Sequence, residues 1–386
     1  MSVFAELVGQ SQIVLALQDA VAASRSGEES QEMTHAWLFT GPPGSGRSSA
    51  AVAFAAALIC PEGGCGTCID CRSAQAGGHA DVEILRSEGL SIKVDEIREL
   101  LQRVAWAPSV GSWRVVVMED ADRLTESAAN ALLKAVEEPG ARTVWLLCAP
   151  TLSDVLPTIR SRTRHLQLRT PSTEDVAEVL MRRDGISPGM ADFAARVSQG
   201  HIGRARHLAN DESIRSRRST IMNLPFNLTS LAAAFSAAAT LLELATEEAN
   251  TQSEARSEKE SRELGEAWGQ GATGRGMASG GAKALKELEK EQKSRTTRMV
   301  RDSLDGALLD LATLYRDVLM VQFSSVASPS SLLNKELAEK IAELAGRTPP
   351  EKILEKLNAI MQARTNLSYN AAPLLTIEAL MCALAQ

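Results

Sequence analysis

The first half of the chain alternates short apolar runs with longer segments whose apolar residues recur at helical spacing. Five of the apolar runs predict β-strands, at His35–Thr40, Asp81–Leu85, Arg114–Met118, Thr143–Cys148 and His165–Leu168. The intervening segments predict helices, among them Ala50–Cys60 and Thr125–Glu138. Apolar strands that alternate with helices are typical of parallel sheets whose two faces are both covered. The pattern therefore predicts an α/β domain over residues 1–168.

From Thr173 onward the apolar positions follow only the helical period. Short helical segments, interrupted at Gly185 and Gly200, predict a small helical lid over residues 169–212. Longer amphipathic segments then predict an all-helical domain over residues 213–386. The expected fold class is α/β plus all-α.

One segment of the helical domain departs from this pattern. The predicted helix Thr229–Ala249 is followed by Asn250–Gly281, which first carries many charges and then becomes rich in glycine. Such a composition buries too little apolar surface to offset the entropy lost on ordering. We therefore expect a flexible insertion at about 250–281.

Composition narrows the class of protein. The 386 residues are 44% apolar and 23% charged, with a formal net charge of -7. A globally basic nucleic-acid-binding protein is thereby excluded, although a local basic patch is not. The sequence has no apolar run long enough to cross a membrane, and its first residues do not have the pattern expected of a secretory signal. We expect a cytoplasmic protein without a membrane partner.

A glycine-rich stretch after the first predicted strand has the spacing of a phosphate-binding loop. The residues that define it are Gly41, Gly44, Gly46, Arg47, Ser48 and Ser49. In such loops, backbone N–H groups and a helix N-terminus face the phosphates of a nucleotide. Arg47 stands where the motif has lysine, and a forked guanidinium is not a conservative replacement for a compact ammonium. The sequence thus predicts an altered nucleotide site.

Four of the six cysteines lie close together, at Cys60, Cys65, Cys68 and Cys71. Without a secretory signal, this spacing favours a metal site over disulfides. Four thiolates satisfy tetrahedral zinc and leave no open position for catalysis. The alternative is four free cysteines in a loop. We expect a structural zinc site.

The predicted strand Arg114–Met118 is followed directly by Glu119 and Asp120. P-loop ATPases carry a Walker B pair at this place, in which an aspartate holds magnesium. The acidic residues here stand in the reverse order, and a carboxylate misplaced by about 1 Å can cost about 100-fold in rate. The pair is compatible with a slow active site or with an acidic strand end that has no catalytic role.

Arg160 and Arg162 precede the last predicted strand. An arginine at this place could form a local salt bridge. It could also reach the nucleotide of a neighbouring subunit as an arginine finger. Spacing alone leaves both roles open.

Further motifs join these features in one chain. They are Val8-Gly9-Gln10, the predicted helix Asn130–Pro139 with the sequence NALLKAVEEP, and the triplet Ser161-Arg162-Thr163. Together with the cysteines, they resemble the clamp-loader branch of the AAA+ ATPases, and within it the delta-prime family of bacterial DNA polymerase III subunits. The resemblance covers Phe4–Ala209. It implies an AAA+ P-loop parallel-sheet domain with an inserted zinc module at 60–71, a helical lid and a C-terminal helical collar domain.

The departures from the motor subunits of that family concern the chain's own ATP site. The resemblance implies that motor subunits carry lysine where Arg47 stands, Asp-Glu where Glu119 and Asp120 stand, and a lid arginine where Gly203 stands. Arg204, the next residue, could substitute for that lid arginine. The finger arginine, in contrast, is retained as Arg162.

The resemblance implies a non-catalytic, stator-like subunit of a DNA polymerase (nucleotidyltransferase) holoenzyme. Arg162 would complete the ATP site of an adjacent motor subunit. The implied partners are the gamma/tau motor subunits and the delta subunit, with the sliding clamp and primed DNA contacted through the complex. Two alternatives stay open: a motor subunit that hydrolyses ATP, and a subunit that binds ATP without hydrolysing it.

Overall fold

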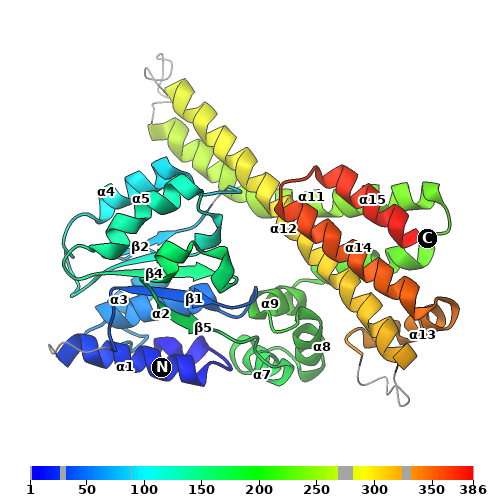
Figure 1. The fold of residues 1–386 in the computed structure, drawn as a ribbon, viewed down its shortest axis with the longest axis horizontal. Helices are drawn as coiled ribbons and strands as arrows, with labels where there is room; N and C mark the ends of the chain where they lie inside the picture. The colour runs from blue at the N-terminus through cyan, green and yellow to red at the C-terminus, as the bar shows by residue number, and fades with distance from the viewer. Residues whose placement is uncertain (1, 27–31, 88, 268–280, 324–331, 386) are drawn as a thin grey trace. The chain divides into compact units, whose positions relative to one another are not determined.

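A computed structural model of the chain describes residues 2–26, 32–87, 89–267, 281–323 and 332–385. The chain divides into two compact units, Met1–Asn210 and Asp211–Gln386. Within these described residues, the first unit holds all the strands and the second is helical (Figure 1). The predicted fold class, α/β plus all-α, is confirmed.

Five strands form one parallel sheet in the order β2-β3-β4-β1-β5. The strands are β1 (Ala36–Thr40), β2 (Val82–Leu85), β3 (Arg114–Met118), β4 (Thr143–Ala149) and β5 (Arg164–Gln167). Each differs from its predicted bounds by at most one residue at either end. The central strands β1 and β4 are buried along their whole length, as their apolar sequences require.

Helices cover both faces of the sheet, because successive strand residues point to opposite sides. Trp37 and Phe39 belong to the apolar core on the side of α1, α2 and α3. Leu38 belongs to the core on the side of α4 and α5 (Figure 1). The helices around the sheet are α1 (Ser11–Ser26), α2 (Arg47–Ile59), α3 (Ile69–Gln75), α4 (Val94–Val104), α5 (Glu126–Glu137) and α6 (Pro157–Arg160), with short 3₁₀ turns η1 (Val3–Glu6), η2 (Ala121–Arg123) and η3 (Leu152–Asp154).

Three helices complete the first unit: α7 (Thr173–Asp184), α8 (Pro188–Ser198) and α9 (Ile202–Asn210). The hydroxyl of Ser172 caps α7, accepting a hydrogen bond from the Asp175 amide at 3.1 Å. Gly185 ends this helix in the left-handed conformation, which glycine adopts without strain. The predicted interruption at Gly185 is therefore the C-terminal end of this helix.

The second unit is an assembly of helices around one apolar core. Its elements are α10 (Glu212–Asn223), η4 (Leu224–Asn227), α11 (Leu231–Ala267), α12 (Gly281–Phe323), η6 (Lys335–Leu337), α13 (Ala338–Arg347), α14 (Pro350–Ser368) and α15 (Pro373–Ala385). Among the described helices of both units, none combines the length and the apolarity that a membrane span requires.

The expectation of a flexible insertion at about 250–281 needs correction for residues 250–267. This stretch continues α11 and pairs with the start of α12 as an antiparallel hairpin outside the apolar core (Figure 1). Polar contacts hold the pair: Arg295 bonds Glu260 at 2.6 Å, and Gln292 donates to the Ser257 carbonyl at 3.0 Å. These partners lie 35 residues apart, so local composition did not reveal them. Residues 268–280 of the expected insertion lie outside the described residues.

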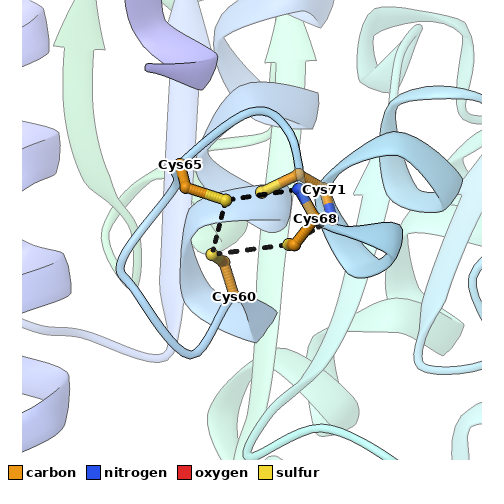
Figure 2. Close-up of side chains that lie close together, drawn as sticks. All are labelled: Cys60, Cys65, Cys68 and Cys71. Carbon is orange, nitrogen blue, oxygen red and sulfur yellow. Dashed lines mark hydrogen bonds between the residues drawn. The ribbon is translucent and has the colours of Figure 1, made fainter. Parts of the chain in front are cut away.

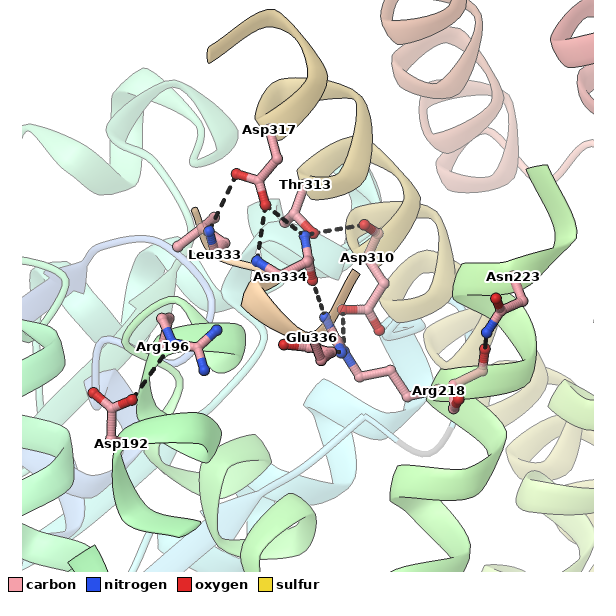
Figure 3. Close-up of polar contacts among 11 residues, drawn as sticks. Asp192, Arg196, Arg218, Asn223, Asp310, Thr313, Asp317, Leu333, Asn334 and Glu336 are labelled. Atoms are coloured by element: carbon pink, nitrogen blue, oxygen red, sulfur yellow. Dashed lines mark hydrogen bonds and ion pairs between the residues drawn. The ribbon is translucent and has the colours of Figure 1, made fainter. Parts of the chain in front are cut away.

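A buried polar cluster holds the residues at the start of η6 against α10 and α12 (Figure 3). The Asp317 carboxylate accepts hydrogen bonds from the Asn334 amide at 2.8 Å and from its side-chain Nδ2 at 2.9 Å. Arg218 of α10 donates to the Asn334 Oδ1 at 2.5 Å and to Asp310 at 3.1 Å. Because Asp317 and Asn334 are fully buried, these bonds offset the cost of removing the polar groups from water.

Candidate functional site

The glycine-rich loop joins β1 to α2, as a phosphate-binding loop does. Gly44 has φ +83° and Gly46 has φ +91°, a backbone conformation that side-chain-bearing residues rarely adopt. Gly46 is also the N-cap of α2, so the N-terminal end of the helix dipole points into the loop. The backbone requirements of the motif are therefore met.

Arg47 is turned back onto its own loop. Its Nη1 donates to the carbonyl of Gly41, the first loop residue, at 2.8 Å. The amide of Ser45 donates to the Pro42 carbonyl at 3.0 Å. A bound phosphate would need loop amides as its donors. The loop has thus partly satisfied its hydrogen bonds internally.

A cavity of about 380 Å³ lies against this loop. It is lined by the loop with the start of α2, by residues 5–8, and by α7 and α9. Four arginines line it: Arg47, Arg182, Arg183 and Arg206. Glu6 is the acidic member of the lining and pairs with Arg183 at 2.6 Å. The excess of positive charge suits an anionic ligand.

The turn before α9 contributes His201 to this cavity and α9 contributes Arg206, with Gly203 between them. His201 packs directly on the loop, since a Cβ atom at Gly44 would lie 2.4 Å from its Cγ. Burial and the charge of Arg204 lower the pKa of His201 below its usual range. Arg204, considered above as a substitute for a lid arginine, is not among the residues described as lining the cavity. Arg206 lines it instead and pairs with Asp184 at 2.7 Å.

The contact of His201 with Gly44 depends on how the start of α9 packs against the loop, and the contact of Arg206 with Asp184 on how α9 packs against α7. Local sequence patterns carry no signal for them.

The acidic pair at the end of β3 is engaged in contacts with its own fold. Arg86 Nε lies 3.0 Å from the Glu119 Oε1, so the carboxylate at the metal position already has a cationic partner. Asp120 is the N-cap residue of η2. Burial and the charge of Asp120 raise the pKa of Asp122, a third carboxylate beside the pair. Among the described residues, one group is arranged to hold a metal ion, and the acidic pair does not belong to it.

That group is formed by Cys60, Cys65, Cys68 and Cys71, whose sulfur atoms all lie within 4.8 Å of one another (Figure 2). The sulfur of Cys60 is 3.8 Å from that of Cys65 and 3.7 Å from that of Cys68. With metal–sulfur bonds of about 2.3 Å, tetrahedral zinc places sulfur atoms about 3.8 Å apart. The separations fit such an ion.

Backbone amides support the sulfur atoms of this cluster. The amide of Cys68 donates to the Cys65 sulfur at 3.3 Å, and the amide of Cys71 to the Cys68 sulfur at 3.3 Å. Hydrogen bonds from Thr67 and from the Cys68 amide lower the pKa of Cys65 to about 6. Burial raises the pKa of Cys71. The turns between the cysteines thus arrange four converging ligands, and the cluster could bind a metal ion.

Arg162 lies just after α6, with its side chain 40% exposed. Its Nη1 donates to the Thr158 carbonyl at 2.9 Å and to the Ser161 Oγ at 3.0 Å. Its Nη2 lies 2.5 Å from the Glu137 Oε1 at the end of α5. The guanidinium is therefore held at the surface and oriented by two neighbouring helices.

Comparison with known proteins shows what the first unit is similar to. The family model described as "DNA polymerase III, delta subunit" matches residues 17–172. The delta' subunit of DNA polymerase III from Pseudomonas aeruginosa is 40% identical over 195 residues, covering 49% of this chain and 59% of the relative. The Escherichia coli delta' subunit is 33% identical over 202 residues, covering 51% and 60%.

The gamma/tau subunit of Mycobacterium tuberculosis is 35% identical over 184 residues, covering 46% of this chain and 31% of the relative. The chain thus spans between about a third and three fifths of the length of these relatives. The matched region contains the phosphate-binding loop, the cysteine cluster, the acidic pair and Arg162. Residues 17–172 are thus similar to the clamp-loader family of DNA polymerase III subunits, to which the gamma/tau and delta' relatives belong.

Proposed function

We propose that the chain is a non-catalytic, stator-like subunit of a DNA polymerase III clamp loader. The observation that carries the proposal is an asymmetry between two parts of one domain. Arg162 is exposed and oriented at the surface, whereas Arg47 is bonded to its own loop and Glu119 is paired with Arg86. A subunit that donates an arginine without using ATP itself needs the first feature and not the second.

In this proposal, Arg162 acts on a neighbouring motor subunit of the gamma/tau type. Its guanidinium would face the phosphates of the ATP bound there and stabilise the charge that develops during transfer. Glu137 would hold the side chain near that orientation before assembly. The neighbour's turnover would then depend on correct docking of this chain.

The remaining parts of the chain have proposed roles in the same assembly. Residues 169–212 would form the lid, and residues 213–386 the collar domain that joins the ring with the delta and motor subunits. The sliding clamp and primed DNA would be reached through the complex. Cys60, Cys65, Cys68 and Cys71 would hold one zinc ion, which stabilises the fold without entering the chemistry.

A second candidate function is a subunit that binds ATP and does not hydrolyse it. The observation that favours it is the cavity of about 380 Å³ with four arginines in its lining. An excess of positive charge attracts nucleotide phosphates even where catalysis is lost. Isothermal titration of the full chain with ATP separates the two candidates, because only the second predicts micromolar binding.

Reconstitution tests the proposed function. The chain is assayed for ATP hydrolysis alone, and the complex of gamma/tau and delta subunits is assayed with and without it, in the presence of clamp and primed DNA. We expect the isolated chain to turn over far more slowly than about 1 per second, the lower end for phosphoryl-transfer enzymes. We also expect clamp-dependent hydrolysis to require the chain. Turnover near 1 per second by the chain alone would identify a motor subunit instead.

A further inference from the structure

We infer that His201 is a specificity-determining residue: together with Arg47 it holds the phosphate-binding loop closed against nucleotides. The inference deepens the proposed non-catalytic function, on which it rests. It assigns the exclusion of ATP to two contacts from different elements, rather than to the substitution at position 47 alone.

The first contact joins the lid to the loop. A Cβ atom at Gly44 would lie 2.4 Å from the Cγ, 2.5 Å from the Cβ and 2.6 Å from the Cα of His201. These separations are far below a van der Waals contact, so the space beside Gly44 is filled by both the main chain and the ring of His201. The peptides next to Gly44 therefore have no room to rotate on that side.

The second contact lies within the loop itself and joins Arg47 to Gly41. Arg47 donates to the Gly41 carbonyl at 2.8 Å, and the Ser45 amide donates to the Pro42 carbonyl at 3.0 Å. A phosphate in the loop would need the Ser45 peptide to turn inward and the guanidinium to leave. Turning that peptide moves Gly44, and His201 opposes this movement. The two contacts are thus coupled through the same few loop residues.

His201 is itself held in place by the lid. Its amide donates to the Ser198 carbonyl at 3.1 Å, and its Nδ1 accepts from the Arg204 amide at 3.2 Å at the start of α9. The preceding Gly200 has φ +85°, and a Cβ atom there would lie 2.3 Å from the Thr170 Cγ2. The turn that carries His201 is therefore packed tightly, and the hydrogen bond to Nδ1 holds the ring in its orientation.

The electrostatics of the ring agree with this role. Burial and the nearby charge of Arg204 lower the pKa of His201, so the imidazole is neutral near pH 7. A neutral ring fills space beside the loop without offering the positive charge that a phosphate would favour.

A double-mutant cycle on the full chain tests the inference. The variants are Arg47→Lys, His201→Ser and both together, and the probe is a fluorescent ATP analogue with Mg²⁺, followed by anisotropy. Serine can still cap α9, because Ser is a favoured N-cap residue. His201→Asn, which also retains a capping side chain, provides a second variant should the serine variant fold poorly. His207→Ser combined with Arg47→Lys is the matched control, since His207 is an exposed residue of the same helix.

We expect each single variant to bind the analogue weakly and the double variant to bind at least about tenfold more tightly than either. The control should bind no better than Arg47→Lys. Arg47→Lys alone reaching the affinity of the double variant would overturn the role of His201 and leave the proposed function intact. If His201→Ser alone reached the affinity of the double variant, Arg47 would have no part in closing the loop, and the inference would be wrong too. Wild-type chain that binds and hydrolyses ATP would overturn the proposed function as well.

Discussion

The Arg162 guanidinium and the Glu137 carboxylate lie 2.5 Å apart, with the side chains 40% and 41% exposed. An ion pair so open to water adds little to folding. Its geometry is better explained by a need to orient Arg162 than by a need for stability. The pair also joins the helix with the NALLKAVEEP sequence to the Ser161-Arg162-Thr163 triplet.

Replacing Glu137 with glutamine should therefore change the free energy of unfolding by at most about 1 kcal/mol, because the pair is solvent-screened. Urea unfolding of the full chain measures this. The contrasting control is Asp81→Asn, since the buried Asp81 carboxylate accepts bonds from the Val110 and Gly111 amides at 2.7 Å. Breaking these buried contacts should lower the free energy of unfolding by about 3–5 kcal/mol. A Glu137 variant as unstable as the Asp81 variant would assign Arg162 a structural role.

Protein purified without chelator should contain about one zinc ion per chain, because four converging thiolates satisfy tetrahedral coordination. Cys68→Ser should lose most of the metal and lower the melting temperature. Cys382→Ser is the control, since this cysteine lies in α15 of the other unit and should leave the zinc content unchanged. Metal analysis by mass spectrometry decides the matter. Less than a tenth of an equivalent in folded wild-type protein would show that the cluster is not a zinc site.

The hairpin of α11 and α12 should depend on pH through Glu260. Hydrogen bonds from Arg295 lower the pKa of this carboxyl from 4.5 to about 2. A carboxyl whose pKa is lowered by folding stabilises the folded state at pH values above its unfolded-state pKa. This stabilisation is lost as the pH falls toward its folded-state pKa. The ionised Glu260 carboxylate should therefore add about 1–3 kcal/mol to the free energy of unfolding at neutral pH, and this amount should decrease as the pH falls below about 4.5.

The measurement is the difference in unfolding free energy between wild type and Glu260→Gln. This difference should narrow between about pH 5 and pH 3. Glu263→Gln is the matched control, because Glu263 lies on the same helix and its side chain is 62% exposed. A difference for Glu260 that stays constant over this range would contradict the assignment.

The sheet could be predicted from sequence because its strands are short apolar runs, which are typical of parallel strands buried on both faces. The cluster of four cysteines could also be predicted, since their close spacing in the sequence brings the thiols together. The hairpin was misjudged because Glu260 finds its partner, Arg295, 35 residues away. The contact of His201 with Gly44 was invisible for the same reason. It arises from the packing of a lid helix on a loop that lies more than 150 residues earlier in the chain.

The most direct test of the proposed function concerns Arg162 in the reconstituted complex. Removal of an arginine finger lowers turnover at its site by about 10³–10⁵. Because several sites share the work in a ring, the loss in the whole complex should be smaller. Arg162→Lys should restore little, since a point charge does not reproduce the fork of a guanidinium.

The measurement is clamp- and DNA-stimulated ATP hydrolysis by complexes that carry Arg162→Ala or Arg160→Ala, with assembly and zinc content checked in both. Arg160 is the control, because it lies two residues away at the end of α6 with the same charge. The account predicts a slow complex with Arg162→Ala and a nearly normal one with Arg160→Ala. Equal and mild effects of the two variants would contradict it.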